Sequence, residues 1–206
     1  NLFNPFNGMV FFALALVVMY YLGSYFQRDD LMKGLLQTQV LIILLPPLVI
    51  LNIFKLKPKE IFRITPPKPR ELAIIPFIAV SGAVLVTLLM NVVDAIYPFP
   101  DQYTEQLMGL FKMSDSLWVM LGIVALAPGI CEEIMFRGFV MRFFEGNSTK
   151  MAVVISALLF GIFHLDPFRL IPTFLLGLIL GYLTIRSGSI INSMLYHTLN
   201  NSVAVL

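Results

Sequence analysis

Two adjacent carboxylates and an arginine lie in a stretch of the sequence that otherwise reads as a membrane-buried helix. They are Glu132, Glu133 and Arg137. One charged side chain at the bilayer centre costs about 2.5–3.5 kcal/mol even on insertion scales, so residues of this kind usually have a function. An acid four positions before an arginine is well placed for an ion pair within a helix, so we expect Glu133 to pair with Arg137. Glu132, about 100° around the helix, is left without a partner and is the candidate general base for a water molecule.

Two further pairs with the same spacing occur in later apolar segments. Phe160 and His164 stand in FGIFH, and His197 and Asn201 stand in HTLNN. A spacing of four places both members of a pair on one face of a helix, and helix bundles bring inward polar faces together. The sequence therefore predicts one shared polar site built from three helices.

The composition is typical of an integral membrane protein. Of the 206 residues, 58% are hydrophobic and 13% are charged, whereas an ordinary soluble domain has about 25% charged residues. The formal net charge of +2 is too small and too scattered for a nucleic-acid-binding surface, so we expect a lipid bilayer and no nucleic acid as a partner. The single cysteine, Cys131, excludes an intrachain disulfide.

The long apolar runs predict helices that cross this bilayer. A helix needs about 20 residues to span about 30 Å of hydrocarbon, and several of the runs are at or just below the lower limit of about 17 residues. Seven runs are found, near residues 9–26, 34–54, 72–96, 117–141, 151–165, 170–186 and 189–206. We therefore predict an all-α fold, a polytopic membrane bundle of about seven transmembrane helices that forms a single domain over residues 1–206.

Basic residues predict the orientation of these helices. The linker 55–71 carries six basic residues and four prolines, and short loops rich in Lys and Arg stay on the cytoplasmic side. This orientation places nine basic residues inside and four outside. Glu132 and His164 lie 14 and 18 residues from a turn expected at Gly146, and His197 lies eight residues into the last run. These similar depths lead us to expect the polar site in the cytoplasmic half of the membrane.

The loop between the third and fourth runs has a helical pattern of its own. Tyr103, Leu107, Leu110 and Phe111 recur at helical spacing beside polar residues. This pattern predicts a short helix that lies in the membrane interface.

The three pairs carry a resemblance to a known family. In them the sequence resembles the CPBP family of glutamate-dependent intramembrane proteases, the CAAX proteases and bacteriocin-processing enzymes that are also called the ABI family. The resemblance covers residues 117–206 and rests on the motifs EExxxR, FxxxH and HxxxN, which occur in the family's order. Residues 1–116 carry no motif that matches.

The resemblance implies an intramembrane endopeptidase of the CAAX-protease type that is glutamic, metal-independent and free of cofactors. In the family, the first glutamate and the histidine of FxxxH activate a water for attack on the peptide carbonyl, while the last histidine and asparagine stabilise the oxyanion. Four residues are catalytic by this resemblance: Glu132, His164, His197 and Asn201. Three are supporting: Glu133, Arg137 and Phe160.

The resemblance also implies partners and a location. The substrate is a peptide or protein, prenylated proteins included, and the location is a prokaryotic cell membrane. Similar modules occur fused to transporter permeases, so fusion or association with a permease is a further expectation. The chain begins at Asn1 without an initiator methionine, which fits a piece of a longer protein.

Two alternatives remain open at this point. A glutamate and two histidines match a zinc ligand set, which allows a zinc-dependent membrane protease although the HExxH spacing is absent. A non-catalytic membrane scaffold or a bacteriocin-immunity protein could keep the same fold. All motif positions are filled with catalytic residue types, and this favours the enzyme.

Overall fold

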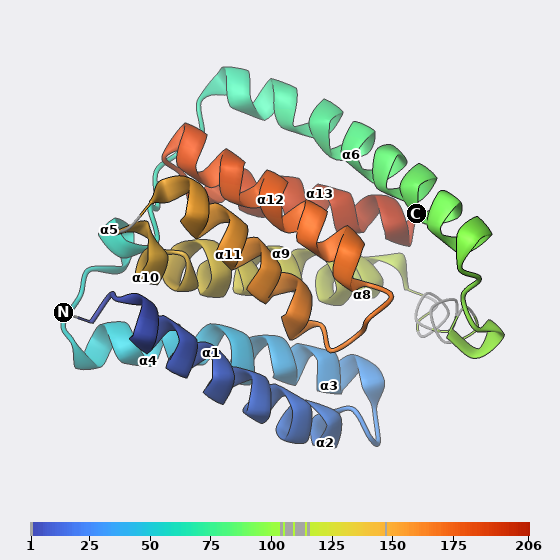
Figure 1. The fold of residues 1–206 in the computed structure, drawn as a ribbon, viewed down its shortest axis with the longest axis horizontal. Coiled ribbons are helices and arrows are strands. Elements are labelled where there is room, and N and C mark those ends of the chain that lie inside the picture. The colour runs from blue at the N-terminus through green and yellow to red at the C-terminus, as the bar shows by residue number, and fades with distance from the viewer. Residues whose placement is uncertain (1, 104, 106–108, 110–113, 115, 147) are drawn as a thin grey trace.

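The chain is helical throughout the part that the structure describes. The computed structural model describes residues 2–206 except 104, 106–108, 110–113, 115 and 147, and no strand occurs among the described residues (Figure 1). The all-α prediction is therefore confirmed.

Two long N-terminal helices are each made of consecutive α-helical and π-helical segments. The first begins after Asn4, whose side-chain oxygen accepts a hydrogen bond from the N–H of Asn7, and Pro5 takes its first position. The second begins after Asp30, which accepts in the same way from the N–H of Lys33. The first consists of α1 (Pro5–Val18), η1 (Met19–Gly23) and α2 (Ser24–Phe26). The second consists of α3 (Leu31–Gln37), η2 (Thr38–Leu44) and α4 (Leu45–Ile53).

The proline-rich linker contains one short helix and leads into a long one. The short helix is α5 (Pro58–Ile61), and the long one is α6 (Pro69–Ile96). Pro69 takes the first position of α6, where its missing N–H has no cost. The Glu71 carboxylate accepts a hydrogen bond from the N–H of Lys68 and so fixes the first turn.

The helix that carries the two glutamates is a composite of five segments. They are α8 (Leu117–Met120), η3 (Leu121–Leu126), α9 (Ala127–Glu133), η4 (Ile134–Val140) and α10 (Arg142–Glu145). The short α-helical segment α9 therefore lies between two π-helical ones. Such π-helical turns are rare and occur frequently at functional sites.

Three helices complete the chain. They are α11 (Thr149–Phe163), α12 (Leu170–Ser187) and α13 (Ile190–Val205). Ser148 and Ser189 cap α11 and α13 by accepting hydrogen bonds from backbone N–H groups. Gly188 ends α12 in the left-handed conformation with φ +69°, which an L side chain would strain.

The composite helix lies in the middle of the bundle. The N-terminal helices lie on one side of it, α11, α12 and α13 lie on the other, and α6 lies outside α13 (Figure 1). Phenylalanine rings fill much of the space between these layers. The buried ring of Phe136 lies against Phe160 and Phe163 of α11, and the buried ring of Phe139 lies against Phe11 of α1. This packing fixes the face of the composite helix on which the glutamates lie.

Fewer helices can cross a membrane than the sequence predicted. Five are long and apolar enough among the described residues: Pro5–Phe26, Leu31–Ile53, Pro69–Ile96, Leu117–Glu145 and Leu170–Ser187. With 15 residues, α11 extends roughly 22 Å, which is short of about 30 Å of hydrocarbon. The count of seven is not confirmed, but the helical membrane bundle is, and the chain is that of an integral membrane protein.

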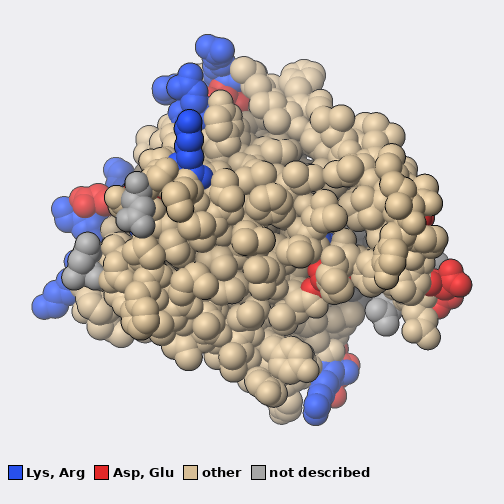
Figure 2. Space-filling model, in the orientation of Figure 1, with Lys and Arg blue, Asp and Glu red and all other residues tan. Residues whose placement is uncertain are grey.

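Basic residues gather at one end of the bundle, where the linker meets α10. Figure 2 shows Lys and Arg along this end, whereas the broad apolar face beside it carries few charges. Arg63 of the linker forms an ion pair of 2.6 Å with Glu145, and Arg142 donates hydrogen bonds to the carbonyl oxygens of Glu60 and Ile61. This end is the one predicted to face the cytoplasm, and that orientation stays a prediction.

Two other predictions are not tested. The interfacial helix falls on Leu107, Leu110 and Phe111, which lie outside the described residues. The single domain over residues 1–206 stays a prediction, although Phe12 and Ile43 of the N-terminal helices share one hydrophobic cluster with Phe139.

Candidate active site

Glu133 and Arg137 form the ion pair that their spacing predicted. The Nη1 of Arg137 donates to the Oε1 of Glu133 over 2.8 Å, and both side chains are fully buried. The Nη2 of Arg137 also donates to the carbonyl oxygen of Gly177 in α12 over 3.2 Å. The guanidinium therefore joins the composite helix to α12 while it neutralises the Glu133 carboxylate.

Phe160 is the aromatic residue around which the site is packed. The guanidinium carbon of Arg137 lies 4.4 Å from the centre of its ring, an arrangement that favours the cation. The same ring meets the imidazoles of His164 and His197 edge to face, with centroid separations of 4.9 and 5.8 Å. Phe160 thereby contacts one member of each of the other two motif pairs.

His197 lies between the two glutamates. Its Nδ1 is 3.0 Å from the Oε1 of Glu133, and its Nε2 is 3.9 Å from the Oε2 of Glu132. The first distance is that of a hydrogen bond, and the second is longer than one. Sequence reasoning placed His197 on the oxyanion side without foreseeing its bond to Glu133.

Glu132 has a hydrogen-bond partner that the sequence reasoning missed. The Nε2 of Gln39, in η2, donates to the Oε1 of Glu132 over 2.7 Å, and both residues are buried. The expectation that Glu132 lacks a partner is therefore wrong, because the partner comes from a helix 93 positions away in the sequence. A glutamine inside an apolar run was the available signal, since polar side chains in membrane spans usually face the bundle interior.

His164 lies at the C-terminal end of α11, directly after its last residue Phe163. Its Nδ1 is 2.8 Å from the carbonyl oxygen of Phe160. A carbonyl can only accept, so the hydrogen-bond network assigns a proton to Nδ1. The neutral ring then presents Nε2 as an acceptor.

Asn201 lies one turn beyond His197 on α13. Its Nδ2 donates to the carbonyl oxygen of Val124 in η3 over 3.2 Å. In an α-helix the N–H of residue 128 would bond to that carbonyl, but Pro128 has no N–H. Asn201 thus supplies a donor where the proline removes one.

Gly129 sets the distance between the glutamates and the histidine on α13. A Cβ at position 129 would overlap the Oγ1 of Thr198 and lie 3.0 Å from the backbone nitrogen of that residue. Thr198 directly follows His197, so the absence of a side chain on α9 brings the two helices to their observed separation. Sequence reasoning did not single out this residue.

The motif residues lie at different distances from the basic end. Counted along straight helices, His197 lies roughly 10 Å from the start of α13, Glu132 roughly 15 Å from Arg142, and His164 roughly 22 Å from Thr149. The site therefore extends toward the middle of the bundle. Its position in the cytoplasmic half stays a prediction.

The two glutamates and the histidines are also residue types that can bind zinc. Among the described residues, no group of three or more His, Cys, Asp and Glu side chains is arranged to hold a metal ion.

One comparison with known proteins matches the segment in which all seven predicted site residues lie. Residues 114–203 match the family model of Rce1-like type II CAAX prenyl endopeptidases. The resemblance to CAAX proteases is confirmed for this segment, and it supports an intramembrane endopeptidase of that type. Gln39 lies outside the matched segment. No curated protein and no solved structure matches the chain.

Proposed function

We propose that this protein hydrolyses a peptide bond at the membrane by means of a water molecule activated by Glu132 and His164. The observation that carries the proposal is the position of the Glu132 carboxylate. Gln39 holds one of its oxygens, and the other faces His197 at a distance too long for a hydrogen bond. That second oxygen is the proton acceptor in the mechanism.

The neighbouring glutamate is unsuited to the same task. The Oε1 of Glu133 accepts from both Arg137 and His197, so its charge is already compensated. A carboxylate held in this way is a poor base for water, and we give Glu133 the role of holding His197 in place.

The reaction proceeds by addition and elimination. His164 accepts one hydrogen of the water through Nε2 and so orients it, while the Oε2 of Glu132 takes the other proton as the water oxygen attacks the peptide carbonyl carbon. The tetrahedral intermediate then breaks its C–N bond. Glu132 returns the proton to the leaving nitrogen, which departs as an amine and leaves a carboxylic acid.

The developing oxyanion is stabilised by donors on α13. Asn201 has a second amide hydrogen beyond the one given to Val124. The Nδ1–H of His197 is given to Glu133, so His197 can donate through Nε2 only when its imidazole carries both protons.

The substrate in this proposal is a peptide or protein at the membrane, prenylated proteins included, and the mechanism requires no metal. The test is cleavage of a prenylated reporter peptide by the protein in lipid nanodiscs. Glu132→Gln keeps the shape but removes the acceptor, so turnover should fall by roughly 10²–10⁴ with unchanged thermal unfolding. Glu60→Gln, which alters an exposed carboxylate, serves as the matched control.

Three results would overturn this proposal. Full activity of Glu132→Gln would remove Glu132 from the mechanism. Activity that is lost after exhaustive chelation and restored by zinc alone would favour the metalloprotease. A wild-type protein that binds the reporter without cleaving it would favour a scaffold.

A further inference from the structure

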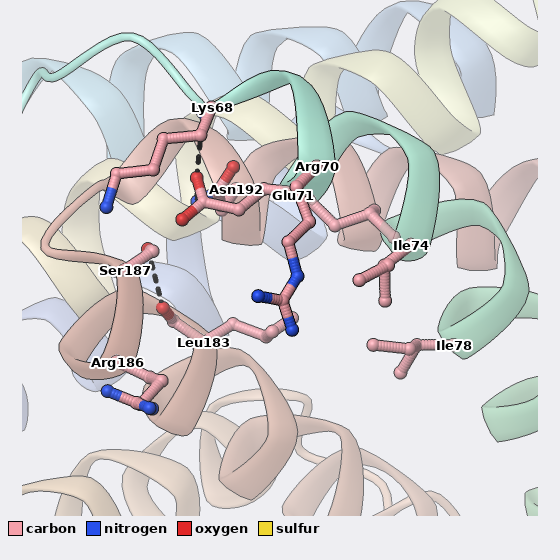
Figure 3. A pocket seen from close by; sticks show the side chains of 10 residues that line it. Lys68, Arg70, Glu71, Ile74, Ile78, Leu183, Arg186, Ser187 and Asn192 are labelled. Carbon is pink, nitrogen blue, oxygen red and sulfur yellow. Dashed lines mark hydrogen bonds between the residues drawn. The ribbon is translucent and has the colours of Figure 1, made fainter.

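A basic pocket lies away from the motif residues, where the start of α6 meets the end of α12. Its volume is about 330 Å³. Lys68, Arg70 and Arg186 line it together with the apolar side chains of Ile74 and Leu183 (Figure 3). It lies at the same end of the bundle as α5 and α10 (Figure 1).

The cations of this pocket lack a matching set of anions. Glu71 is the single carboxylate in the lining, and it accepts hydrogen bonds from the N–H of Lys68 and from the side chain of Asn192. In the part of the chain that the structure describes, none of the three cations forms a salt bridge. The pocket therefore has a positive charge available for a ligand.

An apolar cavity continues from the basic pocket toward the middle of α6. It has a volume of about 450 Å³ and lies between α6, α12 and α13. Ile78 and Leu183 line both cavities, so the two are adjacent. A basic pocket beside an apolar cavity matches the anionic headgroup and the apolar tail of an amphiphile.

Two buried polar atoms along these cavities have no partner among the described residues. They are the Oδ1 of Asn192, which lines the basic pocket, and the hydroxyl of Tyr196, which lines the apolar one. The two residues are 2% and 0% exposed. They lie one turn apart on α13, roughly 6 Å along its axis. Buried groups of this kind usually have a hydrogen-bonding partner, and a bound ligand can supply it.

We propose that this site binds one anionic phospholipid. Lys68, Arg70 and Arg186 hold the phosphate, and the acyl region enters the apolar cavity. Asn192 accepts from a headgroup hydroxyl, and Tyr196 donates to an ester carbonyl that lies about one helical turn deeper.

The lipid site and the candidate active site occupy different faces of α13. Asn192 and His197 are five positions apart, which is about 140° around the helix. Asn192 faces α6 through Glu71, and His197 faces α9 through Glu133. The lipid is therefore a ligand separate from the peptide that the proposed reaction would cleave.

The experiment measures lipid binding to the full chain by native mass spectrometry. The probes are phosphatidylglycerol and phosphatidylcholine with identical acyl chains. The wild-type protein should retain phosphatidylglycerol preferentially. The Arg70→Gln, Arg186→Gln double variant should lose roughly 25-fold in that preference, about fivefold for each cation. Binding of phosphatidylcholine should fall less, because its choline cation already balances its phosphate. The matched double variant Arg28→Gln, Lys33→Gln removes two cations outside the pocket and should behave as the wild type.

Tyr196→Phe tests the deeper contact, and we expect binding to weaken by roughly two- to fivefold for both lipids because both have ester carbonyls.

Equal binding of inorganic phosphate would show a simple anion site and overturn the lipid proposal. Displacement of phosphatidylglycerol by a peptide with a free C-terminal carboxylate would instead identify a substrate pocket. Because the readout is binding, failure of the lipid proposal is distinguishable from failure of the proposed reaction.

Discussion

The composite helix carries two carboxylate–arginine groups in two different environments. In the bundle interior, Glu133 and Arg137 are fully buried and contact three other helices. At the basic end, Glu145 pairs with Arg63 and Arg142, and these side chains are 15–24% exposed. In the interior, removing one partner leaves an uncompensated charge, whereas at the end water compensates for much of the loss. In the interior the carboxylate and arginine therefore belong to a hydrogen-bond network that joins several helices. At the basic end they form partly exposed ion pairs that connect only the linker and α10.

The largest effect on stability is expected in the interior. Glu133→Gln leaves Arg137 as an uncompensated buried charge, which should reduce the free energy of unfolding by about 3–5 kcal/mol. The Glu133→Gln, Arg137→Met double variant should recover part of that loss, since removing both partners of a buried pair is often nearly neutral. Thermal unfolding in detergent measures both variants. A single variant as stable as the wild type would show that the interior pair is no different from the one at the end.

Asn201 should have the next largest effect, on turnover. Asn201→Ala removes a proposed oxyanion donor, and we expect the turnover number to fall by roughly 10²–10³ with substrate binding little changed. Because Asn201 also bonds to the Val124 carbonyl, unfolding is measured in parallel, and Asn91→Ala, at an exposed position of α6, is the matched control. Reduced stability with normal turnover would restrict Asn201 to a structural role.

Gln39 should have a smaller effect because it acts through Glu132. Gln39→Leu removes a hydrogen bond to a charged group, worth about 1.5–3 kcal/mol, so we expect the turnover number to fall by roughly 10–100-fold with KM unchanged. Gln37→Leu, two positions earlier on the same helix, is the control. A rise in KM alone would show that Gln39 contacts substrate and does not position the base.

The smallest effect is expected at the basic end. Glu145→Gln weakens ion pairs that are partly exposed, so the free energy of unfolding should fall by about 1 kcal/mol or less and turnover should stay normal. The unfolding midpoint should also depend less on salt in this variant than in the wild type. A loss as large as that of Glu133→Gln would mean that the two environments do not differ in energy.

The sequence could predict what depends on local spacing. The pairing of Glu133 with Arg137 follows from positions four apart on one helix, and the three motifs predicted which helices approach one another. The contacts of Gln39 with Glu132 and of His197 with Glu133 could not be predicted, because they depend on how distant helices turn toward each other. The two π-helical segments beside α9 change that rotation, and no spacing in the sequence indicates them.

The number of spanning helices was the weaker prediction for a different reason. Hydropathy shows where apolar residues occur but gives the ends of a helix poorly. The ends of α11 are set by Ser148 and His164, and these leave the helix short of the hydrocarbon thickness. His164, one of these end residues, also belongs to the candidate site.

The close approach at Gly129 means that the geometry of the candidate site depends on a residue that belongs to none of the three motifs. One methyl group at this position would press against Thr198 and push α13, with His197, away from the two glutamates, although all seven motif residues would still be present. The motifs alone therefore do not specify the arrangement of the site, because the separation of α9 and α13 is set by a missing side chain.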